Sequence, residues 1–226
     1  MPMHIGLFGG TFNPIHCCHL QIAEQVQSAC KLDRVIFIPT GDPPHKDLRS
    51  LAPAHHRLTM VQKAIESKPS FSISEIEAQS SSVSYTVDTV STLQVESPDV
   101  TQWSFIIGLD AFLEIDTWKN IHHLLDLCHF IVCSRPGSDF SNIASVTCIP
   151  SIPLPSIQNL ANEITHRLDV PLSTSKNLTL LALPPCEASA SSIRRQIQHG
   201  HTSLPWLLPD IESYILQHHV YRNELI

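Results

Sequence analysis

Two histidines near the start of the chain are the residues whose types and spacing most directly suggest chemistry. His16 and His19 lie one helical turn apart in GGTFNPIHCCHLQIAEQV, so they share one face of a helix beginning there. Imidazoles can donate hydrogen bonds to phosphate oxygens, and they carry positive charge when protonated. A phosphate contact, a metal site and a purely structural pair are the three interpretations. We favour phosphate, because no third metal ligand is marked nearby and HExxH is absent.

The residues before this pair indicate a binding site for phosphate. Gly9 and Gly10 follow a predicted strand, Ile5–Phe8, and precede a predicted helix, Leu20–Ala29. Glycine allows a positive φ and a close approach of a ligand to the main chain. We expect the helix to direct free amide groups and its positive dipole end toward this turn. The stretch is neither a P-loop nor a dinucleotide-binding motif, because GxxxxGK[ST] and GxGxxG are both absent.

A second polar run, SASSIRRQI from Ser189, also has the composition of a phosphate-binding helix start. Serine hydroxyls and free amides at a helix N-terminus offer hydrogen-bond donors, and Arg194 adds a positive charge. A capped surface helix is the alternative interpretation. Arg195 is expected to face solvent, since neighbouring residues on a helix point in different directions.

Strands and helices alternate through most of the chain. Short apolar runs predict strands at 5–8, 35–38, 71–76, 105–107, 130–132 and 178–183. Helical patterns follow at 20–29, 55–65, 85–95, 121–127, 192–199 and 210–219, with a short helix from Leu109 and an irregular part over 134–155. The alternation predicts an α/β fold with a parallel sheet and helices on both faces. We expect one domain over 1–226, with a C-terminal helical part over about 185–226.

The composition argues against several classes of protein. A net charge of −7 argues against a nucleic-acid backbone as the general partner. No apolar run reaches the ~18 residues of a membrane span, and the first residues lack the basic region of a signal peptide. The seven cysteines include no CxxC pair, which indicates reduced thiols and a cytoplasmic location.

The motifs resemble those of a known group. GGTFNPIHCCHL resembles the GGTF[DN]PxHxGH motif of the nucleotidyltransferase superfamily that carries the HxGH signature, and SASSIRRQI resembles its distal [ST]-x-x-IR element. The segments PPHK, SYT, FIIGLD, TW and SRPG stand between them, in the order found in the bacterial nicotinate-nucleotide adenylyltransferase family. The matches extend from about Ile5 to Ile197. Cys18 stands where the signature has glycine, and Asn13 replaces the commoner Asp.

This resemblance implies a Rossmann-like fold and the transfer of an adenylyl group from ATP to nicotinate mononucleotide. The residues implied for catalysis are His16, His19 and Arg194. The residues implied for ATP binding are Gly9, Gly10, Thr11, Phe12, His16, His19, Gly108, Asp110, Ser191, Ser192 and Arg194. The residues implied for mononucleotide binding are Thr40, His45, Lys46, Thr86, Trp118 and Arg135. Mg²⁺ is implied through the ATP phosphates, without a protein side chain as ligand.

The implied reaction makes modest demands on the protein. The acceptor is a phosphate monoester whose second pKa is about 6, so near neutral pH it is mostly a dianion. Neither a general base nor a covalent intermediate is required, and catalysis reduces to positioning and charge neutralisation. Nicotinamide mononucleotide or pantetheine phosphate as the acceptor, a non-catalytic nucleotide-binding regulator, and a His/Cys metal-binding protein are the alternatives. Whether two copies form a homodimer stays open.

Overall fold

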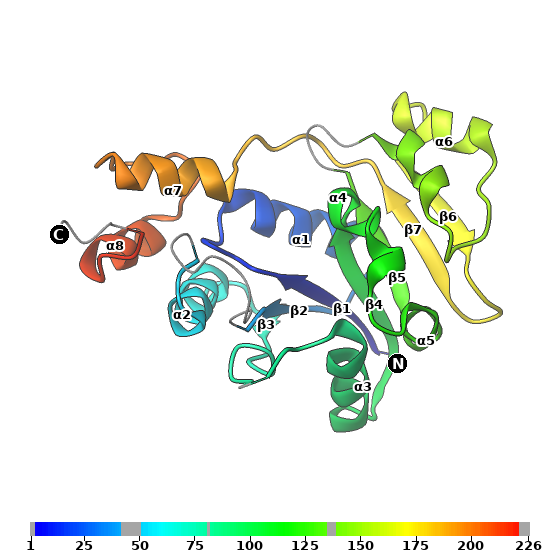
Figure 1. Cartoon of the computed structure of the whole chain (residues 1–226), viewed down its shortest axis with the longest axis horizontal. Helices are drawn as coiled ribbons and strands as arrows, with labels where there is room; N and C mark the ends of the chain where they lie inside the picture. The colour runs from blue at the N-terminus through cyan, green and yellow to red at the C-terminus, as the bar shows by residue number, and fades with distance from the viewer. Residues whose placement is uncertain (1–2, 42–50, 81, 135–138, 222–226) are drawn as a thin grey trace. The chain divides into compact units, whose positions relative to one another are not determined.

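The computed structural model of the chain describes residues 3–41, 51–80, 82–134 and 139–221 (Figure 1). Its strands form a seven-stranded sheet in the order β3-β2-β1-β4-β5-β7-β6. Their bounds are β1 Met3–Gly10, β2 Arg34–Pro39, β3 Phe71–Ile73, β4 Val100–Gly108, β5 His129–Cys133, β6 Arg167–Pro171 and β7 Asn177–Leu181. The pairs β1–β4, β2–β3, β4–β5 and β5–β7 are parallel, and β6 is antiparallel to β7. The chain order reverses at β1, so the loop after β1 leaves the sheet where ligands bind in such folds.

The chain divides into two compact units, which we describe separately. The first unit comprises Met1–Phe8, Gln25–Arg34 and Tyr85–Cys186, and the second comprises Gly9–Glu24, Val35–Ser84 and Glu187–Ile226. Helix α1 (Cys17–Cys30) contributes to both. Within the described residues, no helix combines the length and the apolar character needed to cross a membrane.

The first unit is built around β4 and β5. Buried residues run continuously along the end of β4 (WSFII), as expected for a parallel strand covered on both faces. The Phe130 ring of β5 lies 5.8 Å from Phe105 and 6.1 Å from Phe112 between ring centroids. The helical elements of this unit are α3 Thr86–Glu96, α4 Leu109–Phe112, η2 Ile115–Thr117, α5 Ile121–Leu127, η3 Phe140–Ser145 and α6 Leu154–Ala161. Helix α3 packs against α5, and α6 lies beside β6 (Figure 1).

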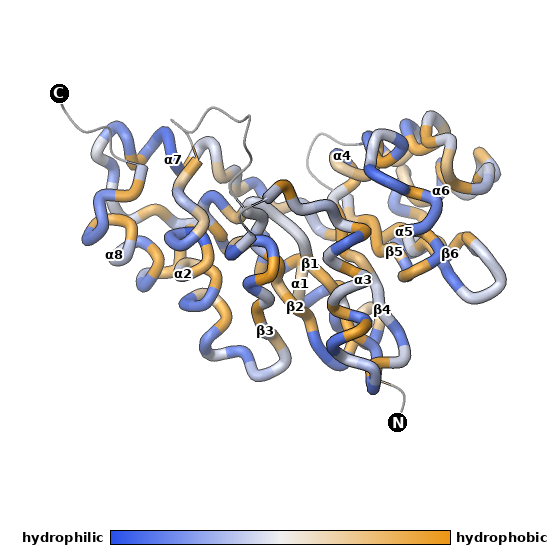
Figure 2. Tube along the Cα trace, turned by 60° about the horizontal axis from the view of Figure 1, so that its bottom comes forward, coloured by the Kyte–Doolittle hydropathy of each residue, from blue (hydrophilic) through white to orange (hydrophobic). Residues whose placement is uncertain are grey.

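The second unit holds α2 (Ala54–Ile65), α7 (Ala190–Gln198) and α8 (Pro209–Gln217). Hydrophilic and hydrophobic segments alternate along α2 and α8 (Figure 2), as in amphipathic helices. Helix α8 packs on α2 and buries Ile211 and Ile215 almost completely. The fully buried Phe37 ring lies 5.7 Å from Phe12 and 5.4 Å from Phe71 between centroids, so an aromatic core supports the loop after β1.

Most predicted elements are confirmed, including the helix that ends before Gly200, whose φ of 79° fits a helix C-terminal glycine. Two predictions were incomplete. The strand predicted over 71–76 ends at Ile73, and the irregular part over 134–155 contains η3 and the start of α6. Sequence analysis missed α6 and β6. Helix α6 starts with prolines, which resemble a loop but are tolerated in a first helical turn.

The cysteines differ partly from the expectation of reduced thiols. Among the described residues, the free thiols are Cys17, Cys30, Cys128, Cys133 and Cys148. Burial raises the pKa of Cys128 to about 12, so this thiol stays protonated near neutral pH. Cys18 and Cys186 are each disulfide-bonded, so the expectation was wrong for these two residues.

Candidate active site

The side chain of Phe12, in the loop after β1, lies over Gly10 at the end of the strand. A Cβ atom at Gly10 would lie only 3.0 Å from Cζ of Phe12, so the aromatic ring occupies the space that a side chain at Gly10 would need. Phe12 has a φ of 45°, in the left-handed region that non-glycine residues rarely adopt. We expected the positive φ at the glycines. The structure instead places it at Phe12, and Gly10 makes room for the ring.

The two histidines at the start of α1 lie against each other. Their ring centroids are 3.9 Å apart, and the Phe12 ring meets His19 edge-on at 5.1 Å. The backbone N–H of His16 donates to Nδ1 of His19 at 3.2 Å. Because Nδ1 accepts this bond, the neutral His19 ring carries its proton on Nε2. The predicted phosphate-binding pair is therefore brought together, with Nε2 of His19 as a hydrogen-bond donor.

Several amides of the expected phosphate site already donate hydrogen bonds within the protein. The N–H of Cys17, the first residue of α1, donates to the carbonyl oxygen of Trp206 at 3.0 Å. The N–H of His19 donates to the carbonyl oxygen of His16 at 2.9 Å. The start of α1 thus offers fewer amides for a phosphate than the sequence suggested.

Arg194 of α7 reaches the same loop. Its Nη1 donates to the carbonyl oxygen of Asn13 at 2.7 Å, and the side-chain Oδ1 of Asn13 accepts from the N–H of Ala52 at 3.0 Å. Ser191 and Ser192 are exposed in the first turn of α7, and the hydroxyl of Ser191 lies 2.8 Å from that of Ser189. The hydrogen bond from Arg194 to Asn13 therefore joins the distal SxxIR element to the loop between β1 and α1.

Sequence reasoning missed Arg57, which organises this region from inside. Its side chain on α2 is completely buried. The guanidinium group donates to four backbone carbonyl oxygens, those of Ala52 at 2.8 Å, Thr11 at 3.0 Å, Thr40 at 2.7 Å and Gly41 at 3.1 Å. Arg57 therefore connects the ends of β1 and β2 to the segment that leads into α2.

A signal for Arg57 was present in the sequence. The buried positions of α2 include Ala54, Met60, Val61 and Ala64, and Arg57 occupies the same apolar stripe. A charged residue at a core position needs buried partners, so it marks a structural or functional network. Its partners are backbone oxygens distant in sequence, and these only the folded chain identifies.

Among the described residues, Thr40 is the one predicted mononucleotide-binding residue that lies in this network. Its N–H donates to the carbonyl oxygen of Gly10 at 3.0 Å, and its own carbonyl accepts from Arg57. The predicted residues His45, Lys46 and Arg135 lie outside the described residues.

The remaining predicted residues belong to the first unit. Gly108 ends β4 and precedes the first turn of α4, where Asp110 is exposed. Thr86 is the first residue of α3, and Trp118 follows η2 directly. Both side chains are half-buried, and the Trp118 ring meets the Phe105 ring edge-on at 5.9 Å. The Trp118 indole therefore has one neighbour in the core and part of its surface in solvent.

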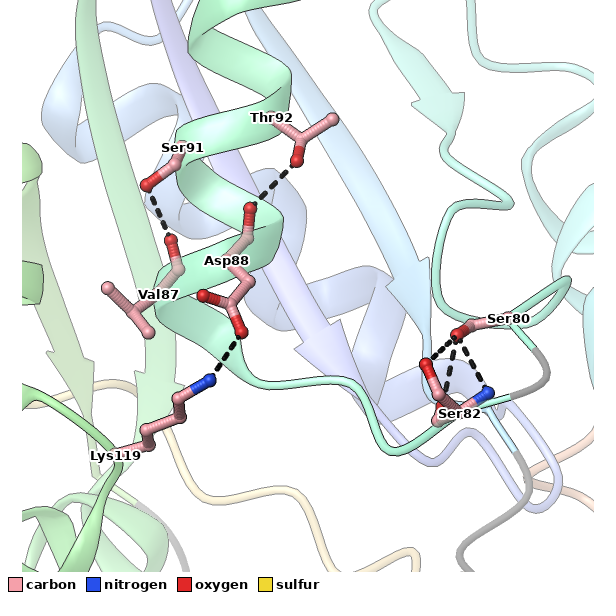
Figure 3. A network of polar contacts seen from close by, with 7 residues as sticks. All are labelled: Ser80, Ser82, Val87, Asp88, Ser91, Thr92 and Lys119. Atoms are coloured by element: carbon pink, nitrogen blue, oxygen red, sulfur yellow. Dashed lines mark hydrogen bonds and ion pairs between the residues drawn. The ribbon is translucent and has the colours of Figure 1, made fainter.

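Polar contacts hold the segments beside Thr86 and Trp118. Nζ of Lys119 lies 2.9 Å from Oδ2 of Asp88 (Figure 3). The same Nζ lies 4.2 Å from the centroid of the Tyr85 ring. Asp116, which precedes Trp118 in the sequence, accepts hydrogen bonds from the N–H groups of Thr147 and Cys148. These bonds lower the pKa of Asp116 to about 2, so its carboxylate stays charged near neutral pH.

Comparisons with known proteins identify the family of the chain. Residues 7–196 match the model of the family described as cytidylyltransferase-like, so the chain belongs to that family of nucleotidyltransferases. A relative from Pelobacter propionicus, named "Probable nicotinate-nucleotide adenylyltransferase", is 38% identical and covers 97% of this chain and 98% of its own. A relative of the same name from Geobacter metallireducens is 34% identical, over 98% and 100%. Within the family, the chain therefore belongs with the nicotinate-nucleotide adenylyltransferases.

Solved structures show the same fold. The nicotinic acid mononucleotide adenylyltransferase of Plasmodium falciparum, complexed with NaAD, superposes with a TM-score of 0.71 at 18% identity over 97% of both chains. The same protein complexed with APC gives a TM-score of 0.69. The predicted α/β fold of nucleotidyltransferase type is confirmed, with β6 as the antiparallel exception.

Proposed function

We propose that this chain transfers the adenylyl group of ATP to nicotinate mononucleotide and releases pyrophosphate, as a step in NAD biosynthesis. The product is nicotinate adenine dinucleotide. The observation that carries the proposal is the convergence of His16, His19 and Arg194 on the loop after β1. The names of the curated relatives support the choice of acceptor.

In the proposed reaction, an oxygen of the mononucleotide phosphate attacks the α-phosphorus of ATP. A new P–O bond forms, the bond from the α-phosphorus to the bridging oxygen breaks, and its electron pair leaves with pyrophosphate. Because the attacking phosphate is mostly a dianion near neutral pH, no side chain has to remove a proton. The protein's task is to hold two anions in line and to stabilise the developing charge. In this scheme Nε2–H of His19 donates to a phosphate oxygen, and Arg194 neutralises the β- and γ-phosphates.

Mg²⁺ fits this site as part of the substrate. The side chains assigned to the triphosphate are imidazoles, hydroxyls and a guanidinium group, none of which is a preferred ligand of this ion. Mg²⁺ commonly binds through substrate phosphates and retains several waters. When bound in this way, the ion offsets negative charge on the leaving pyrophosphate. The protein residues would then hold the MgATP complex through its phosphate oxygens.

We assign the mononucleotide to the other predicted residues. Trp118 would stack on the nicotinate ring beside Thr86, and its partly exposed indole supports this role. Asp110, which is predicted to bind ATP, would accept a hydrogen bond from a ribose hydroxyl of that nucleotide. Thr40, His45, Lys46 and Arg135 would hold the phosphate and the carboxylate of the mononucleotide. A cytoplasmic location remains part of the proposal.

The test is pyrophosphate release from MgATP with one acceptor at a time: nicotinate mononucleotide, nicotinamide mononucleotide or pantetheine phosphate. We expect the highest kcat/KM with nicotinate mononucleotide. A higher kcat/KM with nicotinamide mononucleotide or pantetheine phosphate would identify that compound as the substrate instead. Binding of ATP without release of pyrophosphate, with any of the three, would identify a regulator instead of an enzyme.

Two neighbouring arginines provide a matched control. Arg194 donates to the loop through Nη1, whereas Arg195 is exposed on the same helix. We expect Arg194→Ala to lower kcat/KM by about 100-fold, the scale of losing one preorganised charged donor, and Arg195→Ala to have little effect. Equal effects of the two substitutions would remove Arg194 from its proposed role.

A further inference from the structure

The two residues assigned to the nicotinate ring come from separate segments of the first unit. Trp118 follows η2 directly, and Thr86 is the first residue of α3. Residues from two segments can hold one small ring only if the segments keep a fixed position relative to each other. The side chain of Lys119, the residue after Trp118, joins these two segments.

The ammonium group of Lys119 contacts the start of α3 in two ways. It forms an ion pair with Asp88, at 2.9 Å between Nζ and Oδ2 (Figure 3). It also lies 4.2 Å from the centroid of the Tyr85 ring, within the range of a cation–π interaction. Tyr85 and Asp88 flank Thr86 in the sequence. Lys119 therefore binds the helical turn that carries Thr86.

The first turn of α3 is a firm partner for these contacts. The carbonyl oxygen of Tyr85 accepts from the N–H of Asp88 at 2.9 Å and from the N–H of Thr89 at 3.1 Å. The side chains of Val87 and Thr89 are buried. Both hydrogen bonds and core packing thus fix this turn.

The segment that carries Trp118 is fixed more firmly at one end than at the other. At the start of η2, Ile115 is fully buried, and Asp116 accepts hydrogen bonds from two backbone N–H groups of the loop after η3. Beyond Trp118, the chain continues through the exposed residues Lys119 and Asn120 into α5. The ion pair of Lys119 therefore holds the exposed end of this segment against α3.

We propose that Lys119 is a positioning residue for the mononucleotide: it holds the segment of Trp118 against the start of α3, so that the nicotinate ring meets Trp118 and Thr86 already in place. The inference rests on the proposed function, which assigns the ring to these two residues. Lys119 itself touches no substrate in this scheme. It acts by preorganisation, because a site that is ordered before binding does not lose affinity to ordering.

The test compares Lys119→Met with Lys68→Met, because each substitution removes a charge and keeps an unbranched side chain. Lys68 is a matched control from the second unit: it pairs with Glu24, and its Nζ lies 6.0 Å from the centroid of the Phe71 ring. We expect Lys119→Met to raise KM for nicotinate mononucleotide about 5-fold, the scale of losing a surface ion pair and a cation–π contact. KM for ATP should not change.

Two further comparisons separate positioning from a general effect. Lys68→Met should change neither KM. Lys119→Arg keeps a positive charge beside Asp88 and Tyr85, so it should have a KM for the mononucleotide close to that of the wild type. Because exposed ion pairs contribute little to stability, both methionine variants should melt within about 2 °C of the wild type.

A measurement without ligand tests the position of the indole directly. Replacement of Trp103 and Trp206 by phenylalanine leaves Trp118 as the only tryptophan. In this background, Lys119→Met should increase the quenching of Trp118 fluorescence by acrylamide, because the segment loses its contact with α3. Lys68→Met should leave the quenching unchanged.

Any of four results would overturn the inference. These are an unchanged KM for the mononucleotide in Lys119→Met, an equal rise in KM for ATP or in the Lys68→Met variant, a Lys119→Met variant that melts well below the wild type, and unchanged quenching of Trp118. Failure of the proposed function is visible separately, as a wild-type protein that releases no pyrophosphate with nicotinate mononucleotide. The quenching comparison then still decides whether Lys119 positions Trp118.

Discussion

Replacement of His19 by asparagine or glutamine separates the two hydrogen bonds that this ring can make. Nδ1 of His19 accepts from the N–H of His16 at 3.2 Å, which puts the proton of the neutral ring on Nε2, the proposed donor to a phosphate. The side-chain oxygen of asparagine can take the position of Nδ1, but asparagine has no atom at the position of Nε2. Glutamine has the opposite property, because its amide nitrogen reaches the position of Nε2.

The two bonds differ in expected magnitude. A preorganised donor to the transition state contributes about 3 to 4 kcal/mol, or roughly 100- to 1,000-fold in kcat. A single hydrogen bond to a backbone amide contributes about 1 kcal/mol to folding stability. We therefore expect His19→Asn to fold with nearly wild-type stability and to lose at least about 100-fold in kcat. His19→Gln should lose about 1 kcal/mol of stability and keep a kcat above that of His19→Asn.

The assay combines steady-state release of pyrophosphate, with nicotinate mononucleotide as acceptor, and urea unfolding of the same preparations. His19→Asn should be the more stable variant, and His19→Gln the more active one. A His19→Asn variant with wild-type kcat would refute the assignment of Nε2 as the phosphate donor. Equal losses of stability in both variants would refute the role given to the Nδ1 bond.

Three further substitutions test other parts of the structure. Gly10→Ala places a methyl group 3.0 Å from the Phe12 ring, so this ring must shift, and the His19 ring lies beside it. We expect a kcat about 10-fold lower than that of the wild type. An unaltered kcat would contradict the importance of this packing. In Arg57→Lys, one ammonium group cannot reach all four carbonyl oxygens. Urea unfolding should show a free energy of unfolding about 2 kcal/mol lower, together with a lower kcat. A variant as stable and as active as the wild type would disprove the role of the Arg57 network. Burial lowers the pKa of His129 below its usual value of 6.5, with smaller effects of Lys176 and His4. Below about pH 6.5 the unfolded chain therefore binds more protons than the folded one, and the stability due to this residue is lost as the pH falls through the folded pKa. The stability of His129→Gln should depend less on pH below 6.5 than that of the wild type, and an unchanged pH dependence would contradict this role of His129.

Much of the sheet could be predicted because its signal is local. Apolar runs such as VIFI and FIIG are long enough to identify buried strands, and the spacing of His16 and His19 places both on one helical face. The distal SxxIR element was identified by its resemblance to the superfamily motif, and its residue types agree with a phosphate-binding helix start. The contact between Arg194 and Asn13, separated by 181 positions, confirms that these two motifs meet.

The features that sequence reasoning missed depend on contacts between distant residues. The positive φ of Phe12 follows from how its ring packs over Gly10 and against Phe37. The Arg57 network joins carbonyl groups from three segments, and the loss of the Cys17 amide depends on the carbonyl of Trp206. Strand β6, with the polar sequence RLDVP, is formed by pairing at the edge of the sheet and has no clear pattern of its own.

The most direct test of the account is a crystal structure of the protein with Mg²⁺ and a non-hydrolysable ATP analogue. The account predicts a phosphate oxygen at hydrogen-bond distance, about 3 Å, from Nε2 of His19, with Arg194 on the β- and γ-phosphates. A triphosphate bound away from the loop after β1, with no contact to His16 or His19, would contradict it.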